Sequence, residues 1–219
     1  MFPILFDFGF FALPSYGALV AAGYLAGILW LRARAPEMGL DEDGFWFLIY
    51  CLFFGAIAGG KLLYMAVELP RFISGELRLI GDFRYGFVFF GGFLGALAMG
   101  VVARRRLKFD YLKTADFFGV ALPMGHAIGR LGCLAAGCCY GGPSTLPWAL
   151  AFPEHAASSL PERLWGVPLH PVQLYESGLN ALIAIFLAGF VLPRVRRGAL
   201  REGSVFLGYV VLYSAVRFA

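Results

Sequence analysis

Charged residues are scarce in this sequence, and their scarcity excludes most soluble folds. They make up 15% of the 219 residues, whereas hydrophobic residues make up 60% and the mean hydropathy is +0.74. A soluble domain is nearer half apolar and a quarter charged. Apolar runs of roughly 20 residues, enough to cross about 30 Å of hydrocarbon, recur along the chain. The composition therefore predicts an integral membrane protein, in which 29 glycines let helix backbones approach closely.

Other signals are missing as well. The net charge is +4, yet no long basic run is interleaved with aromatics, which argues against nucleic acid as a partner and favours anionic lipid. The start, M-F-P-I-L-F-D-F-G-F, lacks a basic segment and a small-residue cleavage site, so we expect no removable signal peptide. Neither a repeat nor a second soluble domain is evident. We expect a single integral membrane domain over residues 1–219.

Apolar runs separated by breakers predict the fold class, an all-α polytopic transmembrane bundle of about six spans. The expected spans lie near residues 13–31, 45–66, 86–103, 116–137, 172–193 and 203–219. The longest connection, 138–171, contains six prolines and no convincing span. It is expected to be an extramembrane or interfacial loop between spans four and five.

The distribution of basic residues predicts the orientation. Eleven Lys and Arg residues follow spans one, three and five, and four lie in the connections on the opposite side. Such an excess marks the cytoplasmic face, so both termini should lie outside. Three basic residues remain, and these fall inside spans: Lys61, Arg130 and Arg217.

With this orientation, the polar residues inside spans gather towards the outer side. Tyr16 begins span one, Arg130 lies in the outer half of span four, and Arg217 lies near the outer end of span six. Residues 89–92 and the segment 170–176 reach the same side. A charge at membrane depth costs about 2.5 kcal/mol or more, so it normally faces the bundle interior or a water-filled cavity. We expect a cavity open to the outer leaflet.

Two arginines in such a cavity suggest a phosphate ligand. The guanidinium group is planar and permanently charged, and its fork of donors suits phosphate oxygens. The simplest ligand of this kind in a membrane is a phospholipid head group. The alternative is structural, in which Arg130 and Arg217 satisfy backbone carbonyls or pair with Glu176.

Motifs along almost the whole chain resemble those of a known family, the prolipoprotein diacylglyceryl transferases. The G-R-x-G core and H-P-x-Q-L-Y-E are specific when they occur together, in this order and at these separations. The matching segments are L-P-S-Y-G at 13–17, A-G-G-K-L-L-Y at 58–64, F-G-G at 90–92, G-R-L-G-C-x-x-x-G at 129–137, H-P-V-Q-L-Y-E at 170–176 and L-Y-S-A-V-R-F at 212–218.

The resemblance implies an activity. Members of the family move a diacylglyceryl group from phosphatidylglycerol to the lipobox cysteine thiol of a preprolipoprotein, leaving a thioether and glycerol phosphate. The implied partners are phosphatidylglycerol, the lipid bilayer and the prolipoprotein signal peptide, with no cofactor. The implied location is the bacterial plasma (inner) membrane, as a multi-pass protein whose active site is towards the outer leaflet.

The resemblance also implies roles for individual residues. Arg130 matches the signature arginine and Arg217 the last-helix arginine, and these two would hold the phosphate. Tyr16 matches the first-span tyrosine and would hydrogen-bond lipid or substrate. Gly141 matches a late signature glycine, and Glu176, in H-P-V-Q-L-Y-E, is assigned with it to substrate binding.

Several positions depart from the family pattern. Phe90 replaces a histidine often credited with accepting the thiol proton, and phenylalanine cannot transfer a proton. Cys133 replaces an asparagine and Cys138 a glutamate; Cys133 is assigned to substrate binding. Lys61 replaces an arginine, which keeps a charge for substrate binding but loses the bidentate fork. The family's final span would follow residue 219, so the chain is either a fragment or a branch without that span.

Three of the four cysteines form the pattern C-x4-C-C at 133–139, whereas Cys51 is expected to be a lone packing residue. The cluster lacks the C-x2-C pairs of a structural zinc site, so no metal ligand is assigned, although soft thiolates would favour zinc or copper(I). A disulfide on an oxidising face is another reading. A third interpretation is that Cys138 is a catalytic thiolate acidified by Arg130. In a fourth, the three cysteines only pack in a tight turn.

His126 lies four residues before Arg130, on the same helical face, and is a candidate for the missing base. His170, which precedes a proline, is expected mainly to order the loop. Three hypotheses of function follow: the family's transferase, an enzyme of the same fold that uses the cysteines on another acceptor, and a non-catalytic protein that handles phospholipid or thiols.

Overall fold

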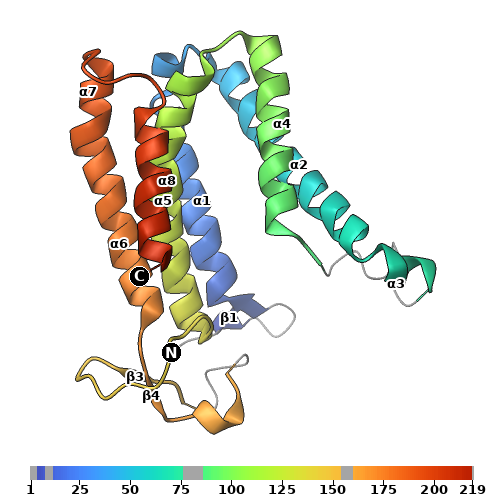
Figure 1. The fold of residues 1–219 in the computed structure, drawn as a ribbon, viewed down its shortest axis with the longest axis vertical. Helices are drawn as coiled ribbons and strands as arrows, with labels where there is room; N and C mark the ends of the chain where they lie inside the picture. The colour runs from blue at the N-terminus through green and yellow to red at the C-terminus, as the bar shows by residue number, and fades with distance from the viewer. Residues whose placement is uncertain (1–3, 8–11, 76–85, 154–159, 219) are drawn as a thin grey trace. The chain divides into compact units, whose positions relative to one another are not determined.

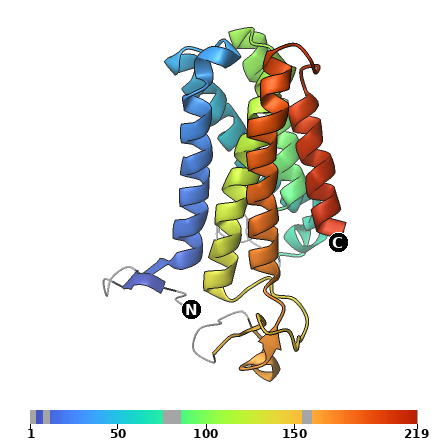
Figure 2. The ribbon, with the colours of Figure 1, turned by 90° about the vertical axis from the view of Figure 1, so that its left-hand side faces the viewer.

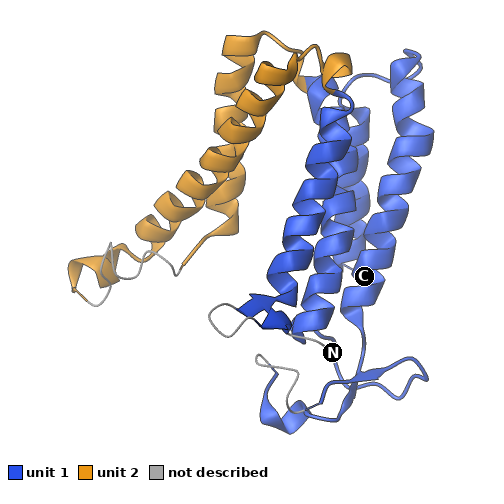
Figure 3. Cartoon of the chain, turned by 180° about the vertical axis from the view of Figure 1, so that it is seen from behind, with its two compact units in different colours: residues 1–34, 112–219 blue, residues 35–111 orange. Residues whose placement is uncertain are grey.

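The computed structural model of the chain describes residues 4–7, 12–75, 86–153 and 160–218. Its contacts divide the chain into two compact units, residues 1–34 with 112–219 and residues 35–111 (Figure 3). A helix occupies each of the six predicted spans within the described residues, which confirms the all-α fold class.

The first unit is a bundle of helices that run side by side in alternating directions (Figures 1 and 2). Its helices are α1 (Ser15–Arg32), α5 (Tyr111–Ala136), α6 (Val172–Phe186), the π-helical turn η4 (Leu187–Val191), α7 (Leu192–Arg196) and α8 (Ser204–Phe218). A short hairpin of β1 (Ile4–Asp7) and β2 (Ala12–Pro14) precedes α1. Among the described residues of the chain, three helices are long and apolar enough to cross a membrane, Glu42–Val67, Tyr111–Ala136 and Val172–Arg196; Ser204–Phe218 is shorter and also apolar.

Small residues and one carboxylate fix the packing of this bundle. A Cβ added to Gly23 of α1 would come within 2.6 Å of the Gly125 carbonyl oxygen of α5, so these backbones approach closely. Asp116 of α5 is 1% exposed and accepts hydrogen bonds from the backbone N–H groups of Gly203, Val205 and Phe206. Because these donors begin α8, Asp116 caps that helix from a neighbouring one.

The connection between α5 and α6 forms a small structured cap beyond the helix ends. It contains β3 (Leu150–Ala151), the 3₁₀ turn η3 (Glu162–Leu164) and β4 (Pro168–Leu169), with β3 and β4 paired antiparallel. Three of its own side chains, Phe152, Leu160 and Leu169, are buried together and form its hydrophobic core. Its described residues contain no span-length helix, in agreement with the predicted loop between spans four and five.

The second unit is a helical hairpin. It consists of the 3₁₀ turn η1 (Ala35–Met38), α2 (Glu42–Val67), the short α3 (Leu69–Ile73) and α4 (Phe89–Leu107). Both long helices carry a G-x3-G pattern, residues 55–59 in α2 and 91–95 in α4. A Cβ added to Gly55 would come within 2.6 Å of the Gly95 carbonyl oxygen. The two patterns therefore bring the helix backbones into contact.

Candidate active site

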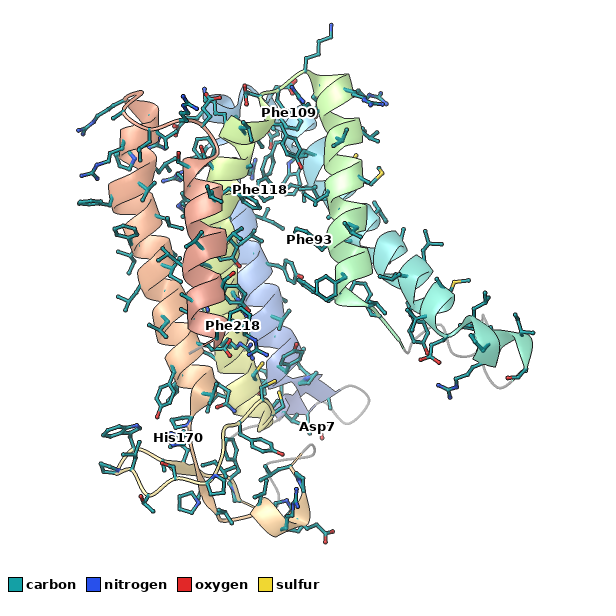
Figure 4. The ribbon with its side chains drawn as sticks, viewed as in Figure 1. Asp7, Phe93, Phe109, Phe118, His170 and Phe218 are labelled. Carbon is teal, nitrogen blue, oxygen red and sulfur yellow. The ribbon has the colours of Figure 1, made fainter. Side chains whose placement is uncertain are left out.

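Four helix ends meet at one end of the first unit. The amino ends of α1 and α6 lie there with the carboxyl ends of α5 and α8, because neighbouring helices alternate in direction (Figures 1 and 2). His170, just before α6, and Phe218, at the end of α8, mark this end of the unit (Figure 4). Within the first unit, the arrangement confirms that helix ends distant in sequence converge.

The convergence produces a charged triad. Nη2 of Arg130 lies 2.6 Å from Oε2 of Glu176, and Nη1 of Arg217 donates to Oε1 of the same carboxylate at 3.0 Å. The Glu176 side chain is 7% exposed, that of Arg130 14% and that of Arg217 61%. Both arginines thus pair with Glu176, as the structural alternative anticipated. One carboxylate against two guanidiniums still leaves a net charge of +1.

The triad keeps hydrogen-bonding capacity for a ligand. Nε of Arg130 is buried and has no hydrogen-bond partner among the described residues. The close contact between Arg130 and Oε2 of Glu176 is an ion pair without hydrogen-bond alignment, so that oxygen is also without a hydrogen-bond partner there. A buried donor left unpaired costs about 1–3 kcal/mol. An anion that supplies an acceptor to Nε would remove this cost.

The sequence analysis missed part of the polar face that holds Glu176. Gln173, Glu176 and Asn180 are all buried on α6, and Asn180 donates through Nδ2 to the Glu176 carbonyl at 2.8 Å. Their spacing of three and four residues places them on one helical face. Polar residues at helical spacing in an apolar span are the signal that would have identified this face.

His126 lies beside the triad. Its ring centroid is 5.0 Å from that of Tyr213, and its electrostatic partners are Arg130, Glu176 and Arg217. Tyr213 was also missed, although it lies four residues before Arg217 and hence on the same face of α8. The structure therefore brings His126 to the charged groups, and its role in proton transfer stays a prediction.

Gly141 and His170 hold the chain where it enters and leaves the cap. The backbone N–H of Gly141 donates to the His170 carbonyl at 3.0 Å, and the His170 N–H donates to Gly142 at 3.0 Å. A Cβ on Gly141 would come within 2.7 Å of the His170 Cβ. His170 therefore orders the loop as expected, and the substrate-binding role of Gly141 stays a prediction.

The cysteines of the cluster are free thiols. Burial, followed by the charges of Cys133 and Cys139, raises the pKa of Cys138 to about 12. Burial and the neighbouring thiols thus act against the thiolate form of Cys138, and its catalytic role stays a prediction. The lone Cys51 is buried in α2, in agreement with a packing role.

Of the remaining predicted residues, Tyr16 belongs to the first unit, and Lys61 and Phe90 belong to the second. Tyr16 is at the first turn of α1, is 46% exposed, and has electrostatic partners in the three clustered thiols. In the second unit, Nζ of Lys61 donates to the Gly86 carbonyl at 2.8 Å, and Phe90 is 70% exposed at the start of α4. The part played by Lys61 in substrate binding stays a prediction.

Comparisons with known proteins agree with this architecture. A family described as prolipoprotein diacylglyceryl transferase matches residues 3–219. A phosphatidylglycerol–prolipoprotein diacylglyceryl transferase of Clostridium tetani is 32% identical, over 99% of this chain and 83% of its own length. Proteins of the same name from Geobacter sulfurreducens and Gloeobacter violaceus are 32% and 34% identical, each over 99% of this chain and 79% of its own length.

Proposed function

The chain belongs to the prolipoprotein diacylglyceryl transferase family, and from this membership we propose that it transfers the diacylglyceryl group of phosphatidylglycerol to the lipobox cysteine of a prolipoprotein. The acceptor sulfur forms a bond to the glyceryl carbon, and the bond from that carbon to the phosphate oxygen breaks. The products are a thioether and glycerol phosphate. The relatives named above carry this activity in their names.

The meeting of Arg130 and Arg217 at Glu176 is the observation that carries the proposal. A phosphate that departs gains negative charge in the transition state, and fixed positive charge near its oxygens lowers the barrier. The triad supplies that charge together with an unpartnered Nε on Arg130. Glu176 is a positioning residue in this scheme, because it holds both guanidiniums towards one place.

His126 and Tyr16 complete the proposed chemistry. His126 gives a proton to the departing glycerol phosphate and recovers one from the acceptor thiol through water, a role that Phe90 is unable to fill. Tyr16, beside the thiol cluster at the start of α1, hydrogen-bonds the substrate. Lys61 and Gly141 keep the substrate-binding roles that the family resemblance implies for them.

We place the protein in the bacterial inner membrane with this end of the first unit at the outer leaflet. The excess of basic residues in the connections on the opposite side supports the orientation. The outer leaflet also suits the proposed substrates, a bilayer phospholipid and a signal peptide that crosses the membrane.

Complementation tests the proposal. The gene is expressed in a strain depleted of its own transferase, and the amino-terminal peptide of a lipoprotein is analysed by mass spectrometry. A diacylglyceryl adduct is expected with the wild-type protein and not with Arg130→Ala. Phospholipid turnover without the adduct would point instead to another acceptor, and phospholipid binding without turnover to a non-catalytic protein; either result overturns the proposal.

A further inference from the structure

The thiol cluster is the chemically active feature that the phosphate-binding triad leaves unexplained. The Sγ atoms of Cys133, Cys138 and Cys139 all lie within 4.8 Å of one another. Cys133 is buried, Cys138 is half-buried and Cys139 is exposed. The cluster therefore extends from the interior of the first unit to its surface.

The local backbone explains why these thiols meet. The N–H of Gly137 donates to the Leu134 carbonyl at 3.2 Å, and the N–H of Cys138 donates to the Cys133 carbonyl at 3.1 Å. With Gly137 at φ 69°, these bonds form a Schellman motif at the end of α5. The motif brings the residue after the glycine against a residue in the last helical turn, a contact that is usually apolar. In this chain both residues are cysteines.

The third thiol is brought to the other two by an unfavourable backbone conformation. Cys139 has φ 59°, in the left-handed region that non-glycine residues seldom adopt. Such a conformation costs of order 1–3 kcal/mol and persists only where the surroundings impose it. The fully buried Gln173 of α6 donates to the Cys138 carbonyl at 2.7 Å and so fixes this turn to the neighbouring helix.

We propose that Cys133, Cys138 and Cys139 bind a zinc ion and leave its fourth coordination position open. Zinc binds thiolates at about 2.3 Å in tetrahedral geometry, which requires sulfur atoms about 3.8 Å apart. Thiols already within 4.8 Å reach that spacing by small side-chain rotations. Three protein ligands and one open position are the arrangement of catalytic rather than structural zinc sites.

The charges around the cluster are compatible with this ion. Three thiolates and one Zn²⁺ carry a net charge of −1. Arg130 has electrostatic interactions with Cys133 and Cys139, so a positive charge lies beside the site. Tyr16 has such interactions with all three thiols. The zinc site would therefore border the two residues already assigned to the transferase reaction.

On the basis of the proposed function, the fourth zinc ligand is the acceptor cysteine of the prolipoprotein. A thiol that coordinates zinc loses its proton, which supplies a thiolate without a strong base. That proton passes through water to His126 and then to glycerol phosphate. The thiolate electron pair forms the C–S bond, and the C–O bond electrons leave on the phosphate. Zinc would thus take over the activation for which Phe90 is unsuited.

Metal analysis of the purified chain tests the site without reference to activity. The protein is purified in detergent under reducing conditions, incubated with zinc, desalted, and measured by mass spectrometry of the elements. We expect one zinc per chain for wild type and for the control Cys51→Ser. We expect at least a tenfold loss for Cys133→Ser combined with Cys139→Ser. A wild-type protein that stays free of zinc, prefers copper(I), or has a disulfide within the cluster when isolated from cells without reductant overturns the site.

Cobalt in place of zinc tests the fourth ligand. A lipobox peptide with cysteine should strengthen the thiolate-to-cobalt charge-transfer absorption, whereas the same peptide with serine should not. Equal spectra with both peptides overturn the acceptor role. Diacylglyceryl transfer, measured separately, distinguishes failure of the zinc site from failure of the proposed function. Transfer by a protein that takes up no zinc refutes the metal site and leaves the proposed function intact. Zinc bound without any transfer refutes the proposed function and the acceptor role with it.

Discussion

Nη2 of Arg130 and Oε2 of Glu176 lie 2.6 Å apart. The side chain of Arg130 is 14% exposed and that of Glu176 is 7% exposed, so water has little access to the ion pair. Removing one partner of such a pair leaves an uncompensated charge, which costs more than the pair itself contributes. Glu176 therefore compensates the permanent charge of Arg130 at that depth. Glu176 also pairs with Arg217, so a single carboxylate holds both guanidiniums in position.

Glu176→Gln should impair both stability and activity. The amide removes the negative charge while preserving the side-chain shape, so Arg130 and Arg217 face each other without compensation. We expect a loss of about 3 kcal/mol in unfolding free energy, the magnitude for a broken buried pair, and a clear drop in turnover. Thermal unfolding in detergent and a transfer assay measure the two effects. Glu162→Gln, at an exposed position of the cap, serves as the control and should change neither.

Lysine at the two arginine positions should have unequal effects. Arg130→Lys loses Nε, the donor that has no partner, at a nearly buried position, so we expect turnover to fall about 100-fold, as for loss of one preorganised donor. Arg217 is 61% exposed, and a lysine there keeps a solvated charge, so about tenfold is expected. Kinetics with phosphatidylglycerol measure both, with Arg163→Lys as the control. Equal losses at positions 130 and 217 would contradict the assignment.

Hydropathy predicted the six helices and the cap, because the cost of unpaired backbone groups in lipid leaves few other structures for apolar runs of this length. The convergence of Arg130 and Arg217 was predictable for a similar reason. Once the spans alternate in direction, loop charge determines which helix ends share a side.

The contacts within the site were less predictable, since they depend on rotations about helix axes and on single backbone turns. The pairing of Glu176 with both arginines appeared only as an alternative. Gln173, which donates to the Cys138 carbonyl, and Tyr213, which packs against His126, were missed. The cluster of Cys133 with Cys138 follows from a Schellman motif, in which one glycine at positive φ brings residues five positions apart together. The sequence analysis relied on the absence of C-x2-C pairs, and this criterion does not detect thiols that a helix-ending turn brings together.

Asp116→Ala should destabilise the first unit. The carboxylate accepts three backbone hydrogen bonds at the start of α8, and alanine would leave those donors unpaired. We expect a loss of about 2 kcal/mol, the upper part of the range for helix caps, measured by thermal unfolding in detergent. Glu202→Gln alters an exposed acidic residue beside the same helix end and should change stability by less than about 0.5 kcal/mol. Similar losses for both variants would contradict the capping role.

Gly55→Val should disrupt the hairpin of the second unit. The added side chain would meet the Gly95 carbonyl and the Met99 side chain, both closer than van der Waals contact permits. Overpacking of this kind costs about 1–3 kcal/mol, so we expect a lower yield of folded protein and a lower unfolding temperature. Gly178→Val, in α6, is the control, because a Cβ there meets nothing within 4 Å. The prediction fails if Gly55→Val is as stable as wild type.

His126→Ala should reduce transfer without unfolding the protein. His126 has the whole triad as electrostatic partners, so a proton on its ring is placed to reach a phosphate held by Arg130 and Arg217. Loss of a general acid–base group costs at least about 100-fold in rate, and we expect a drop of that size in turnover with little change in the Michaelis constant. The ring also packs against Tyr213 at 5.0 Å, so His126→Phe separates packing from proton transfer. Phenylalanine should restore the unfolding temperature and leave turnover low. Recovery of turnover by phenylalanine would show that the ring, rather than its proton, is what the site requires.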